Sequence, residues 1–253
     1  MTAGRIAFRF VGPLSLLVLW QVAGMTHVLD TRFFPTPTAV FWNFVDYARS
    51  GALAHNALAT FSRLIVGLAI GGIPGTALGL AMGMNRWVYA FFQPVFALLY
   101  PIPKIAILPL FYIMFGTGEG AKWAAIAVGV FFLMAINTEA GVRQIERIYL
   151  DVARAYRLRP LTLFFRVLLP GALPNIFAGL KLSIGIAIVL AVAAEYQLTK
   201  SGLGYEIYNA GQLLDVERLY AALVAVSLLG FGLTAAADSL EVLAIPWRRP
   251  PRV

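Results

Sequence analysis

Residues 63–84 read RLIVGLAIGGIPGTALGLAMGM, and only the first of these positions carries a charge. A helix needs about 20 apolar residues to cross roughly 30 Å of hydrocarbon, so this stretch predicts a membrane span. Glycine recurs at every fourth position, which places five glycines on one helix face that another helix can approach closely. They are Gly67, Gly71, Gly75, Gly79 and Gly83. We interpret this face as a helix-packing seam, with a sliding or gating surface helped by Pro74 as the alternative.

Apolar stretches of similar length lie on both sides of this one. The predicted spans cover residues 9–28, 63–84, 88–115 (broken by prolines), 121–138, 176–197 and 219–243. Of the 253 residues, 60% are apolar and only 13% are charged, whereas soluble domains carry about 25% charged residues. Mean hydropathy is +0.79. The expected fold class is therefore all-α, a polytopic membrane protein of about six transmembrane helices forming one domain over residues 1–253.

The basic residues are distributed unequally between the segments that join these spans. With the amino terminus inside, the cytoplasmic segments hold Arg5, Arg9, Arg86, Arg143, Arg147, Arg154, Arg157, Arg159, Arg166, Arg248, Arg249 and Arg252. The outer segments hold Arg32, Arg49, Lys122, Lys200 and Arg218. This asymmetry predicts that both termini are cytoplasmic. Because the basic residues alternate between two sides and form no continuous stripe, the net charge of +8 does not indicate a nucleic-acid partner.

Residues 100–110, YPIPKIAILPL, interrupt the third span with three prolines. Irregular backbone at membrane depth is tolerated only where protein buries it or water reaches it, so the stretch is either a structural kink or the lining of a pathway. We take Pro103, Lys104, Asn137 and Glu195 as candidate substrate-pathway residues, because polar groups in spans are costly. The alternatives are a snorkelling or paired Lys104, a capping or bridging Asn137, and a hydrated or paired Glu195.

A long charged insert, residues 139–175, lies between the fourth and fifth spans on the predicted cytoplasmic side. Residues 150–156, LDVARAY, have helical propensity. Pro160 suits the first turn of a second short helix that continues to Leu169 and that Pro170 ends. We expect these two short helices to lie along the membrane surface and to form a projecting site for a partner protein, which we call the docking knob.

These residues resemble the cytoplasmic signature of one family, the permease subunits of ATP-binding-cassette importers of the nitrate/sulfonate/taurine type. Asp151-Val152-Ala153 stands in the place of the family's Glu-Ala-Ala, and residues 167–170, VLLP, stand in the place of Ile-x-Leu-Pro at the same spacing. The family's glycine position is Arg157 here. A glycine at a helix-ending bend supplies a left-handed conformation, so this departure predicts strain on the order of 1 kcal/mol or a different bend.

The resemblance extends along most of the chain. Its other motifs are residues 34–37 (FPTP), 102–110 (IPKIAILPL), 115–118 (FGTG), 136–138 (INT), 179–183 (GLKLS), 193–196 (AAEY) and 202–204 (GLG). It implies a type I importer fold in a bacterial inner membrane, in which an external binding protein delivers a small solute such as a sulfonate, taurine or nitrate. Two copies of the permease would form the pathway, a pairing that the glycine seam and the lack of a second pseudo-half support.

The resemblance also implies that ATPase subunits dock on the knob. The implied ATPase-coupling residues are Asp151, Val152, Ala153, Arg154, Ala155, Tyr156, Arg157, Val167, Leu169 and Pro170. ATP and Mg would bind the partner ATPase, and no cofactor would bind this chain. The sequence agrees, since it has no Gly-x-x-x-x-Gly-Lys-Ser/Thr phosphate loop.

Two other function classes stay open from the residues themselves, a membrane scaffold or assembly subunit and an intramembrane enzyme. An enzyme should show converging nucleophile, base or metal-ligand groups, and the chain has no cysteine and two isolated histidines, His27 and His55. We also expect no paired carboxylates inside the membrane, hence no catalytic residue and no metal site. A scaffold would need neither a proline-broken span nor a docking knob.

Overall fold

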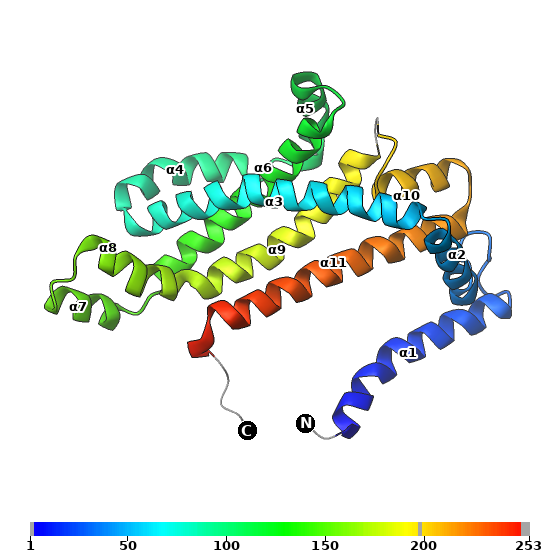
Figure 1. Cartoon of the computed structure of the whole chain (residues 1–253), viewed down its shortest axis with the longest axis horizontal. Coiled ribbons are helices and arrows are strands. Elements are labelled where there is room, and N and C mark those ends of the chain that lie inside the picture. The colour runs from blue at the N-terminus through cyan, green and yellow to red at the C-terminus, as the bar shows by residue number, and fades with distance from the viewer. Residues whose placement is uncertain (1–2, 197–198, 249–253) are drawn as a thin grey trace.

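The computed structural model describes residues 3–196 and 199–248, and within these ranges the chain is built from helices without a β-strand (Figure 1). The elements in chain order are α1 (Ala3–Met25), α2 (Pro37–Arg49), α3 (Ala52–Met84), α4 (Arg86–Leu99), η1 (Lys104–Ile107), α5 (Leu108–Phe115), α6 (Glu119–Arg143), α7 (Arg147–Ala155), α8 (Pro160–Leu163), η2 (Phe164–Leu168), α9 (Leu169–Glu195), α10 (Leu203–Gln212), α11 (Val216–Ala244) and η3 (Pro246–Arg248). The all-α fold class predicted from the sequence is confirmed.

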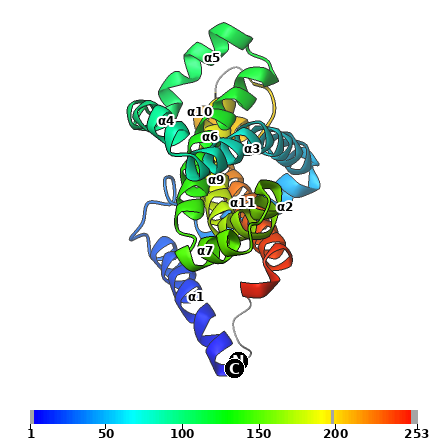
Figure 2. The same ribbon diagram turned by 90° about the vertical axis from the view of Figure 1, so that its left-hand side faces the viewer.

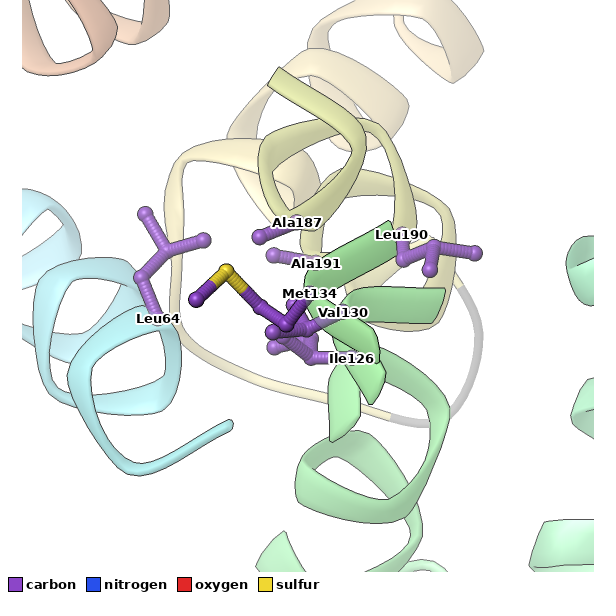
Figure 3. Close-up of a cluster of buried hydrophobic side chains, with 7 residues drawn as sticks. All are labelled: Leu64, Ile126, Val130, Met134, Ala187, Leu190 and Ala191. Atoms are coloured by element: carbon purple, nitrogen blue, oxygen red, sulfur yellow. The ribbon is translucent and has the colours of Figure 1, made fainter. Parts of the chain in front are cut away.

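Three long helices, α3, α6 and α9, form the centre of the bundle, and α11 lies along α9 (Figure 1). Their shared core is apolar, and Leu64 of α3 meets side chains of both other helices there (Figure 3). These side chains are Ile126, Val130, Met134, Ala187, Leu190 and Ala191. Because α9 contributes two alanines, its backbone can lie close to its neighbours.

The five glycines that recur at every fourth position in residues 63–84 all face α6. A Cβ on any of the three middle glycines would collide with a backbone carbonyl oxygen of α6. On Gly75, for example, it would be 2.6 Å from the carbonyl oxygen of Phe131. Gly67 and Gly83 face the side chains of Ile126 and Val142. The seam therefore joins two helices of one chain, and it gives no support to the expected pairing of two copies.

Four helical stretches are long and apolar enough to cross a membrane: α3, α6, Pro160–Glu195 and α11. The pair formed by α4 and Lys104–Phe115 counts as a fifth if it is one span, and it bends by 84° at the predicted proline break. The predicted span near residues 9–28 corresponds to α1, of which the described apolar part, Val11–Met25, is shorter than the others. The described residues thus contain four or five candidate spans, and the count of six stays a prediction.

Helix α3 begins at Ala52, well before the predicted span that starts at residue 63. Gly51 precedes it with a φ of 76°, a left-handed conformation that glycine adopts without strain. The extra turns are buried by α2, α10 and α11, whose apolar side chains cluster around Tyr47 and Leu203. This packing is why polar residues in the first turns of α3 are buried although they precede the apolar stretch.

Helix α1 contacts the rest of the chain near its C-terminal end and inclines away from α11 towards its start (Figure 1, Figure 2). The rings of Trp20 and Tyr220 are 5.9 Å apart, and the Gln21 side-chain amide donates to the Thr38 hydroxyl at 3.2 Å. Several arginines of the predicted cytoplasmic segments, or the side chains of these arginines, lie outside the part of the chain that the structure describes. They are Arg5, Arg9, Arg248, Arg249 and Arg252.

Candidate functional site

Helix α7 and its C-cap residue carry an exposed apolar face. Ile148, Val152 and Tyr156 recur every four residues, and their exposed fractions are 59%, 48% and 78%. On the other side of α7, Leu150 packs against a buried cluster that includes Leu168. An amphipathic helix normally buries its apolar face, so an exposed one marks a surface that another molecule covers.

The same face borders a shallow hollow of about 460 Å³. Apolar side chains and two tyrosines line it: Ile148, Tyr149, Val152, Ala153, Tyr156, Leu158 and Val167. Tyrosine and large aliphatic side chains around a concave apolar surface are typical of a protein-binding site.

The predicted coupling residues come together on this knob, with unequal exposure. Asp151, Val152, Arg154, Ala155, Tyr156 and Arg157 are exposed, Ala153 is buried, and Val167, Leu169 and Pro170 are partly buried. Asp151 and Arg154 pair at 2.9 Å, but both side chains are well exposed, so we expect the pair to stabilise α7 by less than about 1 kcal/mol. The apolar side chains are the part of the knob that a partner can bind strongly.

The bend after α7 has the left-handed conformation that glycine would supply, although Arg157 occupies it. The φ of Arg157 is 47°. The amide of Leu158 donates to the Ala153 carbonyl at 3.0 Å and the amide of Arg157 to the Arg154 carbonyl at 2.9 Å. This pair of bonds is a Schellman motif, in which the left-handed position is normally glycine. Of the two alternatives, the structure shows the left-handed bend, with Arg157 in a conformation that costs a non-glycine residue on the order of 1 kcal/mol.

We expect Arg157→Gly to stabilise the end of α7 by about 1 kcal/mol, because glycine adopts this φ without strain. Hydrogen exchange of the Leu158 amide should slow by about fivefold, which is the same free energy expressed as an equilibrium constant. Arg157→Ala removes the guanidinium but keeps the strain, so its exchange rate should match the parent chain. Equal slowing in both variants would show that charge, and not backbone conformation, controls this bend.

The predicted second short helix does not end at Pro170. The chain is helical from Pro160 to Glu195, and the π-helical turn η2 lies just before the proline. There the amide of Leu169 donates to the carbonyl of Phe164, five residues back. A wider turn accommodates a proline, which cannot donate to the carbonyl four residues before it. The second helix of the knob is therefore continuous with α9, whereas α7 is joined to it through the bend at residues 156–159.

At the opposite end of the bundle, charged side chains from three helices meet around the buried Arg63, and we call them the Arg63 network. Arg63 of α3 pairs with Glu195 of α9 at 2.7 Å and with Glu119 of α6 at 2.8 Å. Lys122 pairs with Glu119 at 2.7 Å, and the Thr60 hydroxyl contacts the Glu195 carboxylate at 2.9 Å. Only 4% of the Arg63 side chain and 0% of that of Glu195 is exposed. Two cations face two carboxylates, so the formal charge of the network is balanced.

The turn between α9 and α10 closes over this network. The amide of Gly204 donates to the Glu195 carboxylate at 2.8 Å, and Arg63 donates to the carbonyl of Ser201 at 2.8 Å. Gly202 has a φ of 116°, and a Cβ there would collide with the Glu195 carboxyl group. The Gly202-Leu-Gly204 motif thus lets the backbone approach a buried carboxylate closely.

A second layer of polar contacts surrounds the first turns of α3. The Asn56 side-chain amide donates to the Tyr47 hydroxyl at 2.9 Å and to Glu206 at 3.2 Å. Arg218 donates to Glu206 at 2.6 Å, and its guanidinium carbon lies 3.6 Å from the centre of the Tyr47 ring. Burial raises the pKa of Tyr47 to about 12. The phenol therefore stays protonated at neutral pH, and α2, α3, α10 and α11 are tied together here.

The four candidate pathway residues lie in different surroundings. Glu195 belongs to the Arg63 network. The Lys104 ammonium donates to the carbonyl of Leu99 at 2.7 Å, where it caps the end of α4, and it lies 4.6 Å from the centre of the Phe132 ring. The Asn137 amide donates to the carbonyl of Leu133 at 2.8 Å, within its own helix. Pro103 precedes η1. Of the four, Glu195 shows its paired alternative, whereas Lys104 caps α4 and Asn137 bonds within its own helix, so neither of these matches the alternative given for it. The pathway role of the four residues stays a prediction.

Sequence reasoning missed the other members of the Arg63 network. Asn56, Thr60 and Arg63 share one helix face at positions i, i+4 and i+7, and this spacing was a signal that α3 starts earlier. We instead placed Arg63 at the first position of an apolar run. The partners of Arg63 come from α6 and α9, far away in sequence, and no local pattern pairs them.

A second ion cluster contradicts one expectation. The Lys181 ammonium of α9 lies 2.6 Å from Asp238 and 2.6 Å from Glu241, both on α11. These carboxylates fall within the predicted span 219–243, so the expectation of no paired carboxylates inside the membrane is wrong. The sequence showed them three residues apart on one helix, but not the lysine that brings them together.

Among residues 3–196 and 199–248, no group of His, Asp and Glu side chains is arranged to hold a metal ion.

Comparison with known proteins points to one family. Residues 75–249 match the family model described as "Binding-protein-dependent transport system inner membrane component". The chain is 34% identical over 243 residues to the putative aliphatic sulfonates transport permease protein SsuC of Escherichia coli (strain K12), covering 96% of this chain and 92% of that protein. It is 28% identical to the taurine transport system permease protein TauC of the same organism, covering 94% and 88% of the two chains.

Two further similarities agree with this match. The nitrate import permease protein NrtB of Synechocystis sp. PCC 6803 is 31% identical, with 91% of this chain and 86% of that protein covered. Among solved structures, an inward-facing conformation of the MetNI methionine ABC transporter superposes with a TM-score of 0.67 at 20% identity, covering 78% of this chain and 98% of that chain. At this identity, the structural similarity shows the fold.

Proposed function

The chain belongs to the family of binding-protein-dependent transport system inner membrane components, and from this premise we propose that it imports a small organic or inorganic anion of the sulfonate, taurine or nitrate kind. It is the permease subunit of an ATP-driven importer. This membership favours transport over the scaffold and the intramembrane enzyme. The substrate class rests on what the similar permeases are named for, and a binding protein would deliver the anion.

We place the α7 end of the bundle in the cytoplasm and the Arg63 network at the outer surface. The support is the distribution of charge, because arginines gather around α7 whereas the Arg63 network is balanced. These arginines are Arg143, Arg147, Arg154, Arg157, Arg159 and Arg166. With α1 crossing the membrane, both termini are cytoplasmic and residues 1–253 form one permease domain.

The exposed apolar face of α7 is the observation that carries the coupling mechanism. We propose that an ATPase subunit, with ATP and Mg bound to it, docks on Ile148, Val152 and Tyr156, while this chain carries out no catalysis. Helix α7 packs through Leu150 on the start of the continuous helix Pro160–Glu195, and α9 packs against α6, so closure of the ATPases would move the bundle through these contacts. A second permease copy would complete the pathway.

Co-purification with a cognate ATPase subunit tests this coupling. Val152→Asp places a charge in the centre of the apolar face, and we expect a loss of about 2 kcal/mol or more, equivalent to a roughly 30-fold weaker complex. Leu214→Asp is the matched control, because Leu214 is a large apolar side chain with 83% exposure at the opposite end of the bundle. It should retain the ATPase.

Retention of the ATPase by Val152→Asp would contradict docking on α7. Loss in both variants would show that the complex responds to general destabilisation, and the docking surface would have to be sought elsewhere. The substrate class is tested separately, by uptake of radiolabelled taurine, an alkanesulfonate and nitrate into proteoliposomes that contain the complete importer and binding protein.

A further inference from the structure

The ion cluster of Lys181, Asp238 and Glu241 lies away from the docking knob and from the Arg63 network, and we call it the Lys181 triad. It joins α9 to α11 with two contacts of 2.6 Å on a single ammonium group. One positive and two negative groups give it a formal charge of −1. An ammonium has three N–H donors, so one donor of Lys181 is not needed for these two carboxylates.

The position of the triad along α9 gives its depth in the membrane. Glu195, in the Arg63 network, marks the outer level, and Asn175, which donates to Gln144 at 3.1 Å, marks the inner level beside Arg143. Asn175 and Glu195 are 20 residues apart on α9, a rise of about 30 Å, which is the thickness of the hydrocarbon core. Lys181 follows Asn175 by six residues, about 9 Å. Lys181 and Asp238 each lie five residues inside the cytoplasmic ends of the predicted spans 176–197 and 219–243, and Glu241 lies two residues inside, so the triad lies near the cytoplasmic ends of these spans.

The triad is not sealed inside the protein at this depth. The exposed fractions of the Lys181, Asp238 and Glu241 side chains are 30%, 57% and 23%. A carboxylate facing lipid here is strongly unfavourable, and an aspartate is too short to reach the headgroups as a lysine can. Ionisable groups at such depths face a water-filled space or another protein group.

The neighbouring side chains favour the water-filled space. Residues 234–239 of α11 read TAAADS, so no side chain larger than aspartate projects from this part of the helix. Ala235 and Ser239 are exposed on the same stretch. Small side chains leave room for water around the one charged group.

We propose that the Lys181 triad lines the translocation pathway and controls the passage of the anion, an inference that rests on the proposed function. The third N–H of Lys181 can donate a hydrogen bond to a passing anion, and the net negative charge of the triad keeps that anion from being held, so that it leaves again. Conduction requires both, because a site that binds too tightly does not release. Lys181 is thus a specificity-determining residue, and Asp238 and Glu241 position it.

The absence of native cysteine makes the accessibility test direct. Asp238→Cys is the single thiol of its variant, and in lipid nanodiscs it should react with a charged, membrane-impermeant thiosulfonate at least tenfold faster than Leu240→Cys. Leu240 is the matched control, since it lies two residues away on a different face of α11 and has 55% exposure. An unreactive Asp238→Cys would mean that lipid or a second copy covers the triad, and equal rates would mean that water surrounds the whole helix end. Either result overturns the proposal.

Transport kinetics test the charge control. Lys181→Met leaves two carboxylates unopposed and should lower kcat/KM for the anion at least tenfold, whereas Lys181→Arg should restore most of it. Asp238→Asn removes the excess negative charge and should lower both KM and kcat, because the anion is held longer. All variants should retain the ATPase in co-purification. Unchanged kinetics in Lys181→Met would overturn the proposal.

The two proposals fail in distinguishable ways. If the parent importer takes up none of the tested anions, the proposed substrate class is wrong, while the thiol labelling still decides whether the triad faces water.

Discussion

Replacing Glu195 with alanine is expected to destabilise the chain by about 3–5 kcal/mol, because it leaves the buried Arg63 guanidinium without one of its carboxylates. The Glu195 side chain is fully buried and accepts from Arg63 at 2.7 Å and from the Gly204 amide at 2.8 Å. The exposed Glu119 carboxylate stays near Arg63, but it cannot reach the donors of the α9–α10 turn. The loss should therefore appear both in global stability and in the order of that turn.

The free energy of unfolding in detergent micelles measures the global effect. Glu217→Ala is the matched control, since Glu217 is an exposed glutamate in the first turn of α11, and it should change stability by less than about 0.5 kcal/mol. The double variant Arg63→Leu with Glu195→Leu should recover part of the loss, because no buried charge is then unpaired. A double variant less stable than Glu195→Ala would mean that Arg63 stabilises the fold mainly through Glu119 and Ser201.

The Arg63 network shows what the sequence could not reveal. The helical fold follows from hydropathy alone, since apolar runs of about 20 residues admit few other structures in a membrane. Glu195 was also visible as an ionisable residue at a span end. Its partner was not, because Arg63, Glu119 and Glu195 come from three helices and meet only after these pack. Hydropathy defines spans one at a time and does not say which faces meet.

The docking knob was more accessible to sequence reasoning, because its signal is local. The helix around residues 150–156 follows from local propensity, whereas the bend at Arg157 and the coupling residues were expected from the family resemblance. The error at Pro170 has a physical cause: a proline ends an α-helix in water, but the π-turn η2 lets the chain continue as one helix. The Lys181 triad was only half visible in the sequence. Its two carboxylates are neighbours on α11, but its lysine is on another helix, and no local pattern pairs it with them.

Replacing Gly75 with alanine should destabilise the chain by about 1–3 kcal/mol, although alanine is the better helix former. A Cβ on Gly75 would lie 2.6 Å from the carbonyl oxygen of Phe131 and 3.0 Å from the Cβ of Met134. The nearer atom belongs to the backbone of α6 and cannot rotate away, so the two helices must separate. Because the glycine seam continues along α3, separation at one point loosens the contacts on either side of it.

Gly72→Ala is a control within the same helix turn. Gly72 is also buried, but a Cβ there would meet nothing closer than the Val130 Cγ1 at 3.8 Å, an ordinary contact. Alanine should therefore be neutral or stabilising by up to about 1 kcal/mol at this position. Thermal unfolding of both variants measures the difference, which should be about 1–4 kcal/mol in favour of Gly72→Ala. If the two variants unfold alike, α3 and α6 can slide to admit a methyl group, and the seam would be the gating surface that its glycine spacing also allows.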